Sequence, residues 1–185
     1  MTGMDRRRRS ALLALWGITA LLIAGCSGDA GKPPAGPYQI AEVFDGDSFN
    51  LKATNGRIVR VRLAGIDAPE KSQPYAQKAK DSLTELLSTG PITLEPIKVD
   101  QYQRWVANIR AGDRDVGREQ ITRGYAWFFT RYRQDLSEAM QMDYAQTEHE
   151  AREARRGLWA GLSAKGNPAL YPEPPWEFRQ RSKRP

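Results

Sequence analysis

Apolar and polar side chains alternate between residues 38 and 63, in three short runs separated by turn residues. A period of two is typical of half-buried β-strands. The pattern predicts strands at 38–44, 48–53 and 57–63. In the last run Val59, Val61 and Leu63 share one face, so Arg62 lies on the other and is expected to be free for solvent or a ligand.

The hydrophobic spacing then becomes helical, with Leu83, Leu86 and Leu87 on one face of a helix expected at 73–88. Further on, the pattern predicts strands at 92–99 and 105–111 and helices at 116–123 and 136–156. Asp135 is the expected N-cap of the last helix and Gly157 its stop. Five strands with a helix after the third match the OB-fold, so the expected fold class is α+β, mainly β: a five-stranded, partly open barrel with about three helices.

The chain of 185 residues is long enough for one domain after its N-terminal segment is set aside. Residues 26–37 are rich in Gly and Pro and read as a flexible tether, which leaves 38–160 as the expected folded domain. Residues 161–185 form a Pro-rich, basic tail. We expect this tail to be extended or disordered, with Trp176 as a candidate anchor.

The N-terminus has the features of an export signal. Four arginines at 6–9 precede an apolar run at 11–25, which is shorter than the roughly 20 residues that a membrane-spanning helix needs. The run ends in Leu-Ile-Ala-Gly before Cys26, which resembles the lipobox of bacterial lipoproteins. Cys26 is the only cysteine, so no disulfide can form within the chain.

This pattern predicts a lipoprotein-type signal peptide at 1–25 and a lipid anchor on Cys26 that attaches the protein to a membrane. The expected location is the cell envelope, on the outer membrane or its periplasmic face if the host has two membranes. The alternative is a plain secretory signal in which Cys26 is incidental and the protein is secreted.

The net charge of +6 is concentrated at the two ends of the chain. Residues 5–9 supply +3 and residues 177–184 another +3, so the folded middle is close to neutral. An anionic partner must therefore be inferred from particular arginines and not from a global positive field.

Three short clusters contain the candidate chemistry: Asp45-Gly46-Asp47-Ser48, Arg62 to Glu70, and Asp100 to Arg104. Together they offer carboxylates for a hard divalent cation, one more carboxylate as a base, and two arginines for a phosphate. Each cluster alone also has an ordinary interpretation: a tight Asp-Gly turn, a strand end before a helix, and a solvated strand residue. Their joint occurrence favours metal-assisted phosphodiester hydrolysis.

The order and spelling of these clusters resemble the staphylococcal nuclease family. Its pattern is D-G-D-[TS], then R-L-x-x-[IV]-D-x-P-E, then D-x-Y-G-R, followed by G-L-W and a P-P-W-E tail. This chain has matching blocks at 45–48, 62–70, 100–104, 156–159 and 174–177. The resemblance covers about residues 38–179.

The resemblance implies a calcium site. Asp47 and Asp67 would be the side-chain ligands, the backbone carbonyl of Ala68 a third ligand, and Asp45 a support behind them. The only histidine, His149, lies in the last expected helix away from the motifs, so a zinc site is not expected.

The resemblance also implies the catalytic groups. Glu70 would be the general base, and Arg62 and Arg104 would bind the phosphate oxygens and stabilise the transition state. The implied activity is that of a sugar-nonspecific endonuclease that cuts DNA or RNA, preferring single-stranded or frayed regions, and leaves 3′-phosphate ends. The protein is expected to act as a monomer.

Substrate binding needs further contacts. Tyr102, Tyr125 or Trp127 could stack on bases, although most aromatic residues in a domain of this size belong to the core. Lys71 is a candidate for an additional phosphate contact.

One departure from the family pattern affects these expectations. Gln103 stands where D-x-Y-G-R has glycine, and if that position has positive φ the glutamine strains the turn and could displace Arg104. Two alternatives therefore stay open. One is a catalytically weak OB module that binds single-stranded nucleic acid at the cell surface. The other is an envelope lipoprotein in which the acidic pairs are turns and Ca²⁺ gives no stabilisation.

Overall fold

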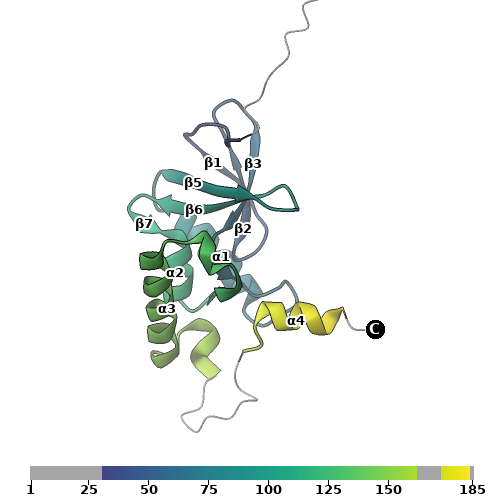
Figure 1. The fold of residues 1–185 in the computed structure, drawn as a ribbon, viewed down its shortest axis with the longest axis vertical. Helices are drawn as coiled ribbons and strands as arrows, with labels where there is room; N and C mark the ends of the chain where they lie inside the picture. The colour runs from purple at the N-terminus through teal and green to yellow at the C-terminus, as the bar shows by residue number, and fades with distance from the viewer. Residues whose placement is uncertain (1–30, 162–171, 184–185) are drawn as a thin grey trace, which may run out of the picture. The chain divides into compact units, whose positions relative to one another are not determined.

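Five long strands lie side by side in one sheet, in the order β1-β2-β3-β6-β5 (Figure 1). This computed structural model describes residues 31–161 and 172–183. The strands are β1 Gln39–Val43, β2 Ser48–Lys52, β3 Ile58–Leu63, β5 Ile92–Val99 and β6 Trp105–Ala111. All five strands predicted from the alternating pattern are therefore confirmed, with bounds that differ by one residue at most.

The pairing of these strands is OB-like. β1–β2, β2–β3 and β5–β6 pair antiparallel, whereas β3 and β6 run parallel, with Val61 opposite Trp105 and Leu63 opposite Ala107. In the described part of the chain β1 and β5 do not pair with each other, so the sheet is not closed into a barrel. The OB-like α+β fold is confirmed, but the expected barrel is an open sheet.

Three two-residue strands complete the β-structure. β7 Arg114–Asp115 extends the edge of β6, and β4 Ile66–Asp67 pairs with β8 Trp127–Phe128. The β4–β8 pair is antiparallel, with Asp67 opposite Trp127. It therefore places a carboxylate from the second sequence cluster beside a segment sixty residues further along the chain.

The main core lies between the sheet and two helices, α1 Ala76–Leu87 and α2 Val116–Thr122. Its members are apolar residues from alternating strand positions and from one face of each helix. They include Phe49, Leu51, Val59, Val61, Leu63, Leu83, Leu86, Leu87 and Ile121. Burying a large apolar side chain contributes about 1.5–3 kcal/mol, so this alternation stabilises the sheet and leaves Arg62 on its other face.

The helix termini differ from the expected ones. α1 begins at Ala76 and not at 73, because Pro74 precedes a left-handed Tyr75 with φ of 69°. α3 spans Glu138–Glu153, and its N-cap is Ser137, whose hydroxyl accepts a hydrogen bond from the N–H of Met140. The expectation that Asp135 caps this helix was wrong, since the Asp135 carboxylate instead accepts from Lys98 at 2.7 Å.

The C-terminal segment contains a helix, α4 Pro175–Ser182, drawn in yellow in Figure 1. The expectation of an extended or disordered tail was wrong for these residues. Proline at the start of a helix is favourable because its missing N–H has no helical partner there. Trp176 stacks on Phe129 with ring centroids 5.2 Å apart, which confirms Trp176 as an anchor.

Two expectations for the N-terminus, the signal peptide at 1–25 and lipidation of Cys26, concern residues outside the described ranges. Within residues 31–161 and 172–183, no helix combines the length and the apolar character needed to cross a membrane. His149 lies on α3 and is exposed, as expected.

Candidate active site

A cleft of about 710 Å³ contains residues from all three acidic and basic clusters. They come from the β1–β2 turn, the end of β3, β4 and the residues after it, and the β5–β6 turn. The predicted site residues that line it are Asp45, Asp47, Arg62, Asp67, Ala68, Glu70, Tyr102 and Arg104. The structure thus brings together groups that are separated by up to sixty residues in sequence.

The β1–β2 turn is held by Asp45, whose Oδ1 accepts hydrogen bonds from the N–H groups of Asp47 at 3.0 Å and Ser48 at 2.7 Å. Gly46 lets this turn approach α1 closely. A Cβ at Gly46 would lie only 2.7 Å from the Cβ atoms of Ala68 and Ala79. Asp45 therefore fixes the position of Asp47 through the backbone, which is compatible with the supporting role expected for it.

Arg62 joins the two carboxylates that were predicted to bind metal. Its guanidinium donates to Oδ1 of Asp47, and to Oδ1 of Asp67 at 2.8 Å. Asp47 and Asp67 are 3% and 1% exposed, so these ion pairs are largely shielded from water. Oδ2 of Asp47 accepts from the N–H of Ala68 at 2.8 Å, which attaches the β1–β2 turn to the residues after β4.

The carboxylates of the cleft crowd one another. Burial raises the pKa of Asp45 to about 7, and the neighbouring charge of Asp47 adds to this effect. Burial also raises the pKa of Asp67, although hydrogen bonds from Arg179 and the charge of Arg62 oppose the shift. In both cases burial disfavours the charged carboxylate, and a cation bound beside it would favour the charged form.

The donor set in the cleft suits a hard divalent cation. The carboxylates of Asp47 and Asp67 and the carbonyl of Ala68 offer only oxygen, the ligand type that Ca²⁺ and Mg²⁺ prefer. The two carboxylates also lie close enough to share one guanidinium. Residues 31–161 and 172–183 contain no group of three or more His, Cys, Asp or Glu side chains arranged for a metal. Binding of a cation in this cleft would therefore depend on the carboxylates of Asp47 and Asp67 and the backbone carbonyl of Ala68.

Arg104 enters the cleft from the β5–β6 turn. Its Nε donates to Oδ2 of Asp100 at 2.8 Å, and its Nη1 lies 3.3 Å from the hydroxyl of Ser48. Gln103 has φ of 60°, so the glutamine does occupy a left-handed conformation that favours glycine. Asp100 also accepts from the N–H groups of Tyr102 and Arg104, at 2.9 and 3.0 Å. These bonds hold the turn, and Arg104 stays in the cleft despite the strain.

Glu70 has a partner that the sequence reasoning missed. Arg179 of α4 donates from Nη1 to Oε1 of Glu70 at 2.6 Å and from Nη2 to Oδ2 of Asp67 at 2.7 Å. The P-P-W-E block showed that the C-terminal segment also resembles the family. No local sequence pattern, however, indicated that the side chain of Arg179 would reach the cleft.

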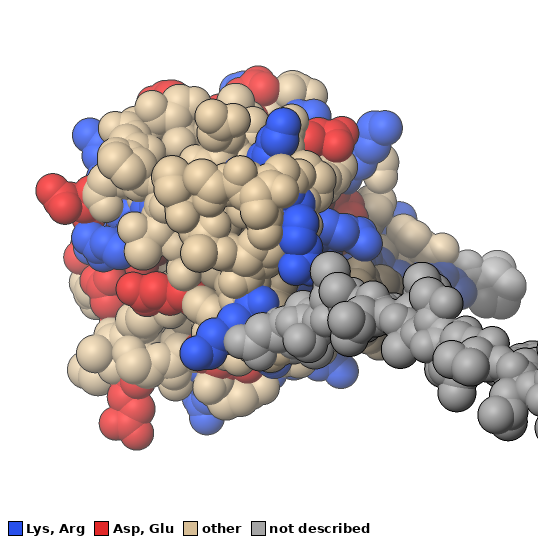
Figure 2. Space-filling view, turned by 90° about the horizontal axis from the view of Figure 1, so that it is seen from above, with Lys and Arg blue, Asp and Glu red and all other residues tan. Residues whose placement is uncertain are grey.

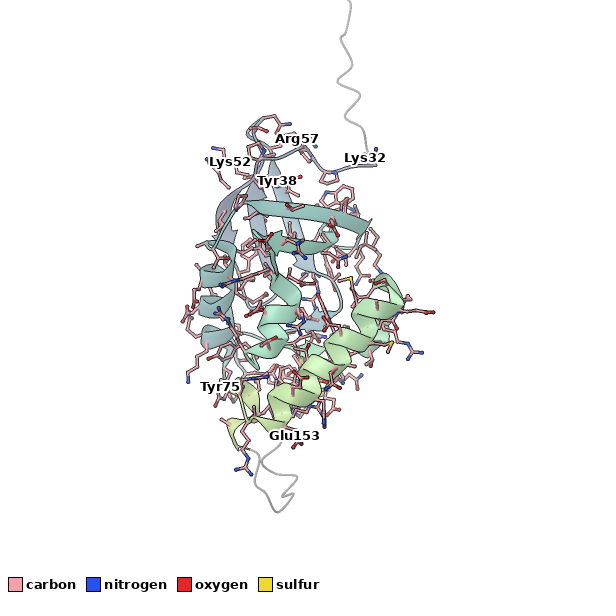
Figure 3. The ribbon with its side chains drawn as sticks, turned by 90° about the vertical axis from the view of Figure 1, so that its left-hand side faces the viewer. Lys32, Tyr38, Lys52, Arg57, Tyr75 and Glu153 are labelled. Atoms are coloured by element: carbon pink, nitrogen blue, oxygen red, sulfur yellow. The ribbon has the colours of Figure 1, made fainter. Side chains whose placement is uncertain are left out.

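Of the three aromatic residues expected to stack on bases, Tyr102 lines the cleft, whereas Tyr125 and Trp127 do not. Tyr102 is 60% exposed at the edge of the cleft, with the Cζ of Arg104 5.2 Å from its ring centroid. Tyr125 does not line the cleft and packs instead near Tyr75, which Figure 3 labels at the end of the molecule where Glu153 also lies. Trp127 is 2% exposed, so the suggestion that it stacks on bases was wrong.

Lys71 is also separate from the cleft and lines a second, shallow hollow with Tyr75. The surface in Figure 2 shows Lys and Arg interspersed with Asp and Glu, between wide areas of other residues. This mixture agrees with a folded middle that is close to neutral. Attraction of an anionic ligand would therefore depend on the arginines within the cleft.

Comparison with known proteins agrees with this geometry. The sequence model of the family described as "Staphylococcal nuclease homologue" matches residues 60–161. A probable staphylococcal-like nuclease of Oryza sativa subsp. japonica is 34% identical over 124 residues, 67% of this chain and 30% of the relative.

Two bacterial relatives carry the description "uncharacterized endonuclease". The one from Haemophilus influenzae is 32% identical over 66% of this chain and 65% of the relative. The one from Escherichia coli O157:H7 is 30% identical over 77% of this chain and 84% of the relative. The chain spans less than a third of the rice relative but most of the latter bacterial one. This protein belongs to the staphylococcal nuclease family.

Proposed function

We propose that this protein is a nuclease that hydrolyses phosphodiester bonds in DNA and RNA. The observation that supports this most directly is the convergence of Asp47, Asp67, Glu70, Arg62 and Arg104 in one cleft. The relatives described as nucleases and endonucleases support the same reaction class.

The cation proposed for the cleft is Ca²⁺, held by Asp47, Asp67 and the carbonyl of Ala68. When bound, it would stabilise negative charge that develops on the phosphate. Arg62 pairs with both carboxylates in this structure, and it would bind a phosphate placed beside them once a cation neutralises those carboxylates. Arg104 would contact the phosphate from the opposite turn, where Asp100 orients its guanidinium.

Glu70 is the proposed general base. Its carboxylate lines the cleft, and it would accept a proton from the water that attacks phosphorus. The proposed products carry 3′-phosphate ends, and Tyr102 would stack on a base of a single-stranded or frayed substrate without reading sequence. We propose a monomer as the active form.

A further part of this proposal is export, with a lipid anchor on Cys26. It is supported by the lipobox-like residues before the cysteine. Labelled palmitate should be incorporated into the wild-type protein expressed in a bacterium, and not into the Cys26→Ser variant. Equal labelling of both proteins would refute the anchor.

The nuclease proposal is tested with the purified full chain, single-stranded DNA, duplex DNA and RNA, in Ca²⁺ or in excess chelator. We expect Ca²⁺-dependent cleavage and products whose 3′ ends a phosphatase can modify. Gln103, which has positive φ where the family pattern has glycine, motivates a second candidate, a nucleic-acid-binding module of low activity, although Arg104 lines the cleft. DNA that is bound but not cut by the folded protein would support this second candidate.

A further inference from the structure

The C-terminal helix α4 reaches the cleft although it lies outside residues 60–161, which match the family model. Arg179 is the residue of α4 that contacts the candidate catalytic groups. Its guanidinium spans Glu70 and Asp67 through two short hydrogen bonds, 2.6 Å to Oε1 and 2.7 Å to Oδ2. A third contact, from Nη1 to Oδ1 of Asp67, is 3.3 Å long.

The position of α4 does not depend on Arg179 alone. Trp176 stacks on Phe129 at 5.2 Å and meets the ring of Trp127 edge-on at 6.4 Å. Pro175 at the start of the helix is buried. Because these contacts are apolar and lie one helical turn away, the helix should stay docked when the guanidinium is removed.

Glu70 itself lies on an irregular segment between β4 and α1, where the secondary structure does not restrain it. Its N–H donates to Oε1 of Gln73 at 2.9 Å, and Nε2 of Gln73 donates to the carbonyl of Glu173 at 2.8 Å. The backbone of Glu70 is thus connected to the C-terminal segment through a buried glutamine, and its side chain through Arg179.

We propose that Arg179 is a positioning residue that holds the carboxylate of Glu70 at a set distance from Asp67, so that α4 is a working part of the active site. This proposal rests on the proposed function. A planar guanidinium that donates to two carboxylates restrains both their separation and their orientation. A general base must lie within hydrogen-bond reach of the proton it takes, and a displacement of about 1 Å can cost about 100-fold in rate.

The contact with Asp67 gives the proposal a second consequence. The positively charged guanidinium of Arg179 lies 2.7 Å from Oδ2 of Asp67, so it repels a cation bound to the same carboxylate. Removing the charge of Arg179 should therefore leave Ca²⁺ binding unchanged or make it tighter, while hydrolysis becomes slower. A purely structural defect would weaken both.

The test compares Arg179→Met with Arg181→Met in the full chain. Arg181 is a matched control because it lies on the same helix, is more exposed, and pairs with Glu173 and not with the cleft carboxylates. In Arg179→Met we expect kcat at saturating Ca²⁺ to fall by about 10- to 100-fold, with KM within about threefold of wild type. Calorimetric titration with Ca²⁺ should show an equal or lower Kd. Arg181→Met should match wild type in all three quantities.

A double variant then separates positioning from other roles. If Arg179 acts through Glu70, adding Arg179→Met to Glu70→Gln should cause little further loss of kcat, because groups that act as a unit are not additive. A full additional loss in the double variant would overturn the proposal. So would an unchanged kcat in Arg179→Met, a raised kcat, or loss of Ca²⁺ binding together with activity.

If the wild-type protein cleaves no nucleic acid, the proposed function is refuted, and this result is distinct from the results that would overturn the role of Arg179. Amide hydrogen exchange of residues 68–73 is the readout that remains in that case. Faster exchange there in Arg179→Met than in Arg181→Met supports the positioning of this segment by Arg179. Equal exchange refutes it.

Discussion

At the scale of single residues, Glu70 is the group on which the proposed hydrolysis depends. We expect Glu70→Gln to slow cleavage by about 10²- to 10⁴-fold, since an amide can accept a hydrogen bond from Arg179 but cannot take up a proton. Single-turnover cleavage measures the loss, and fluorescence anisotropy of a labelled oligonucleotide should show retained Ca²⁺-dependent binding. A wild-type cleavage rate would remove Glu70 from the mechanism.

Gln103 carries backbone strain at φ of 60°, in a turn that other bonds maintain. We expect Gln103→Gly to stabilise the protein by about 1 kcal/mol, because glycine adopts the left-handed region without the clash of a Cβ. Urea denaturation of both proteins measures this difference. Gln101→Gly, two residues away in the same turn, is the control and should be neutral or destabilising. A less stable Gln103→Gly variant would show that the glutamine side chain contributes more than its strain costs.

The two residues also differ in how far sequence could predict them. The glycine of the family pattern raised positive φ at position 103 as a condition, and the structure shows it, because turn geometry is local. The partner of Glu70 lies more than one hundred residues away, and only the folded chain brings Arg179 to it.

At the scale of elements, the segments that follow α2 and α3 pack against each other through two glycines. The N–H of Leu158 donates to the carbonyl of Gly124 at 2.8 Å, and both Gly124 and Gly157 have positive φ. A Cβ at Gly124 would overlap the carbonyl of Arg156. Two backbone segments can approach this closely only where side chains are absent.

We therefore expect Gly124→Ala to destabilise the protein by about 3 kcal/mol, as the sum of left-handed strain and overpacking against backbone. Gly56→Ala is the matched control, since Gly56 also has positive φ but a Cβ there meets nothing within 4 Å. It should cost only about 1 kcal/mol. Chemical denaturation compares the two variants, and equal losses would contradict the role of the close contact between these two segments.

At the scale of the whole molecule, a bound cation should stabilise the folded state. The cleft gathers carboxylates whose raised pKa values reflect burial and mutual repulsion, and unfolding would disperse them. A ligand at 100 times its Kd contributes about 2.7 kcal/mol to the free energy of unfolding. We expect the melting temperature to rise with Ca²⁺ in a concentration-dependent way.

Asp47→Asn tests where this effect arises. The variant should show a smaller Ca²⁺-induced rise above its own cation-free melting temperature and require more Ca²⁺ for cleavage. An identical rise would place the ion elsewhere. The absence of any rise in wild type would favour the envelope-lipoprotein alternative, in which the acidic pairs are turns.

The sequence by itself determined the strands, the sheet's buried face, and the identity of the residues in the three clusters. Strand and turn patterns are short-range properties, so Val59, Val61 and Leu63 revealed the buried face of β3 without knowledge of its partners. The motif order indicated the family, which the comparisons then showed.

The tertiary structure alone decided the features that depend on long-range contact. Trp127 is buried because Trp159 and Trp176 pack on it, so an aromatic residue expected to bind bases belongs to the interior. α4 forms where Trp176 stacks on Phe129, and a short helix with little amphipathic pattern is stabilised mainly by docking. Its docking in turn places Arg179 against Glu70 and Asp67, since side chains distant in sequence meet only when the chain folds.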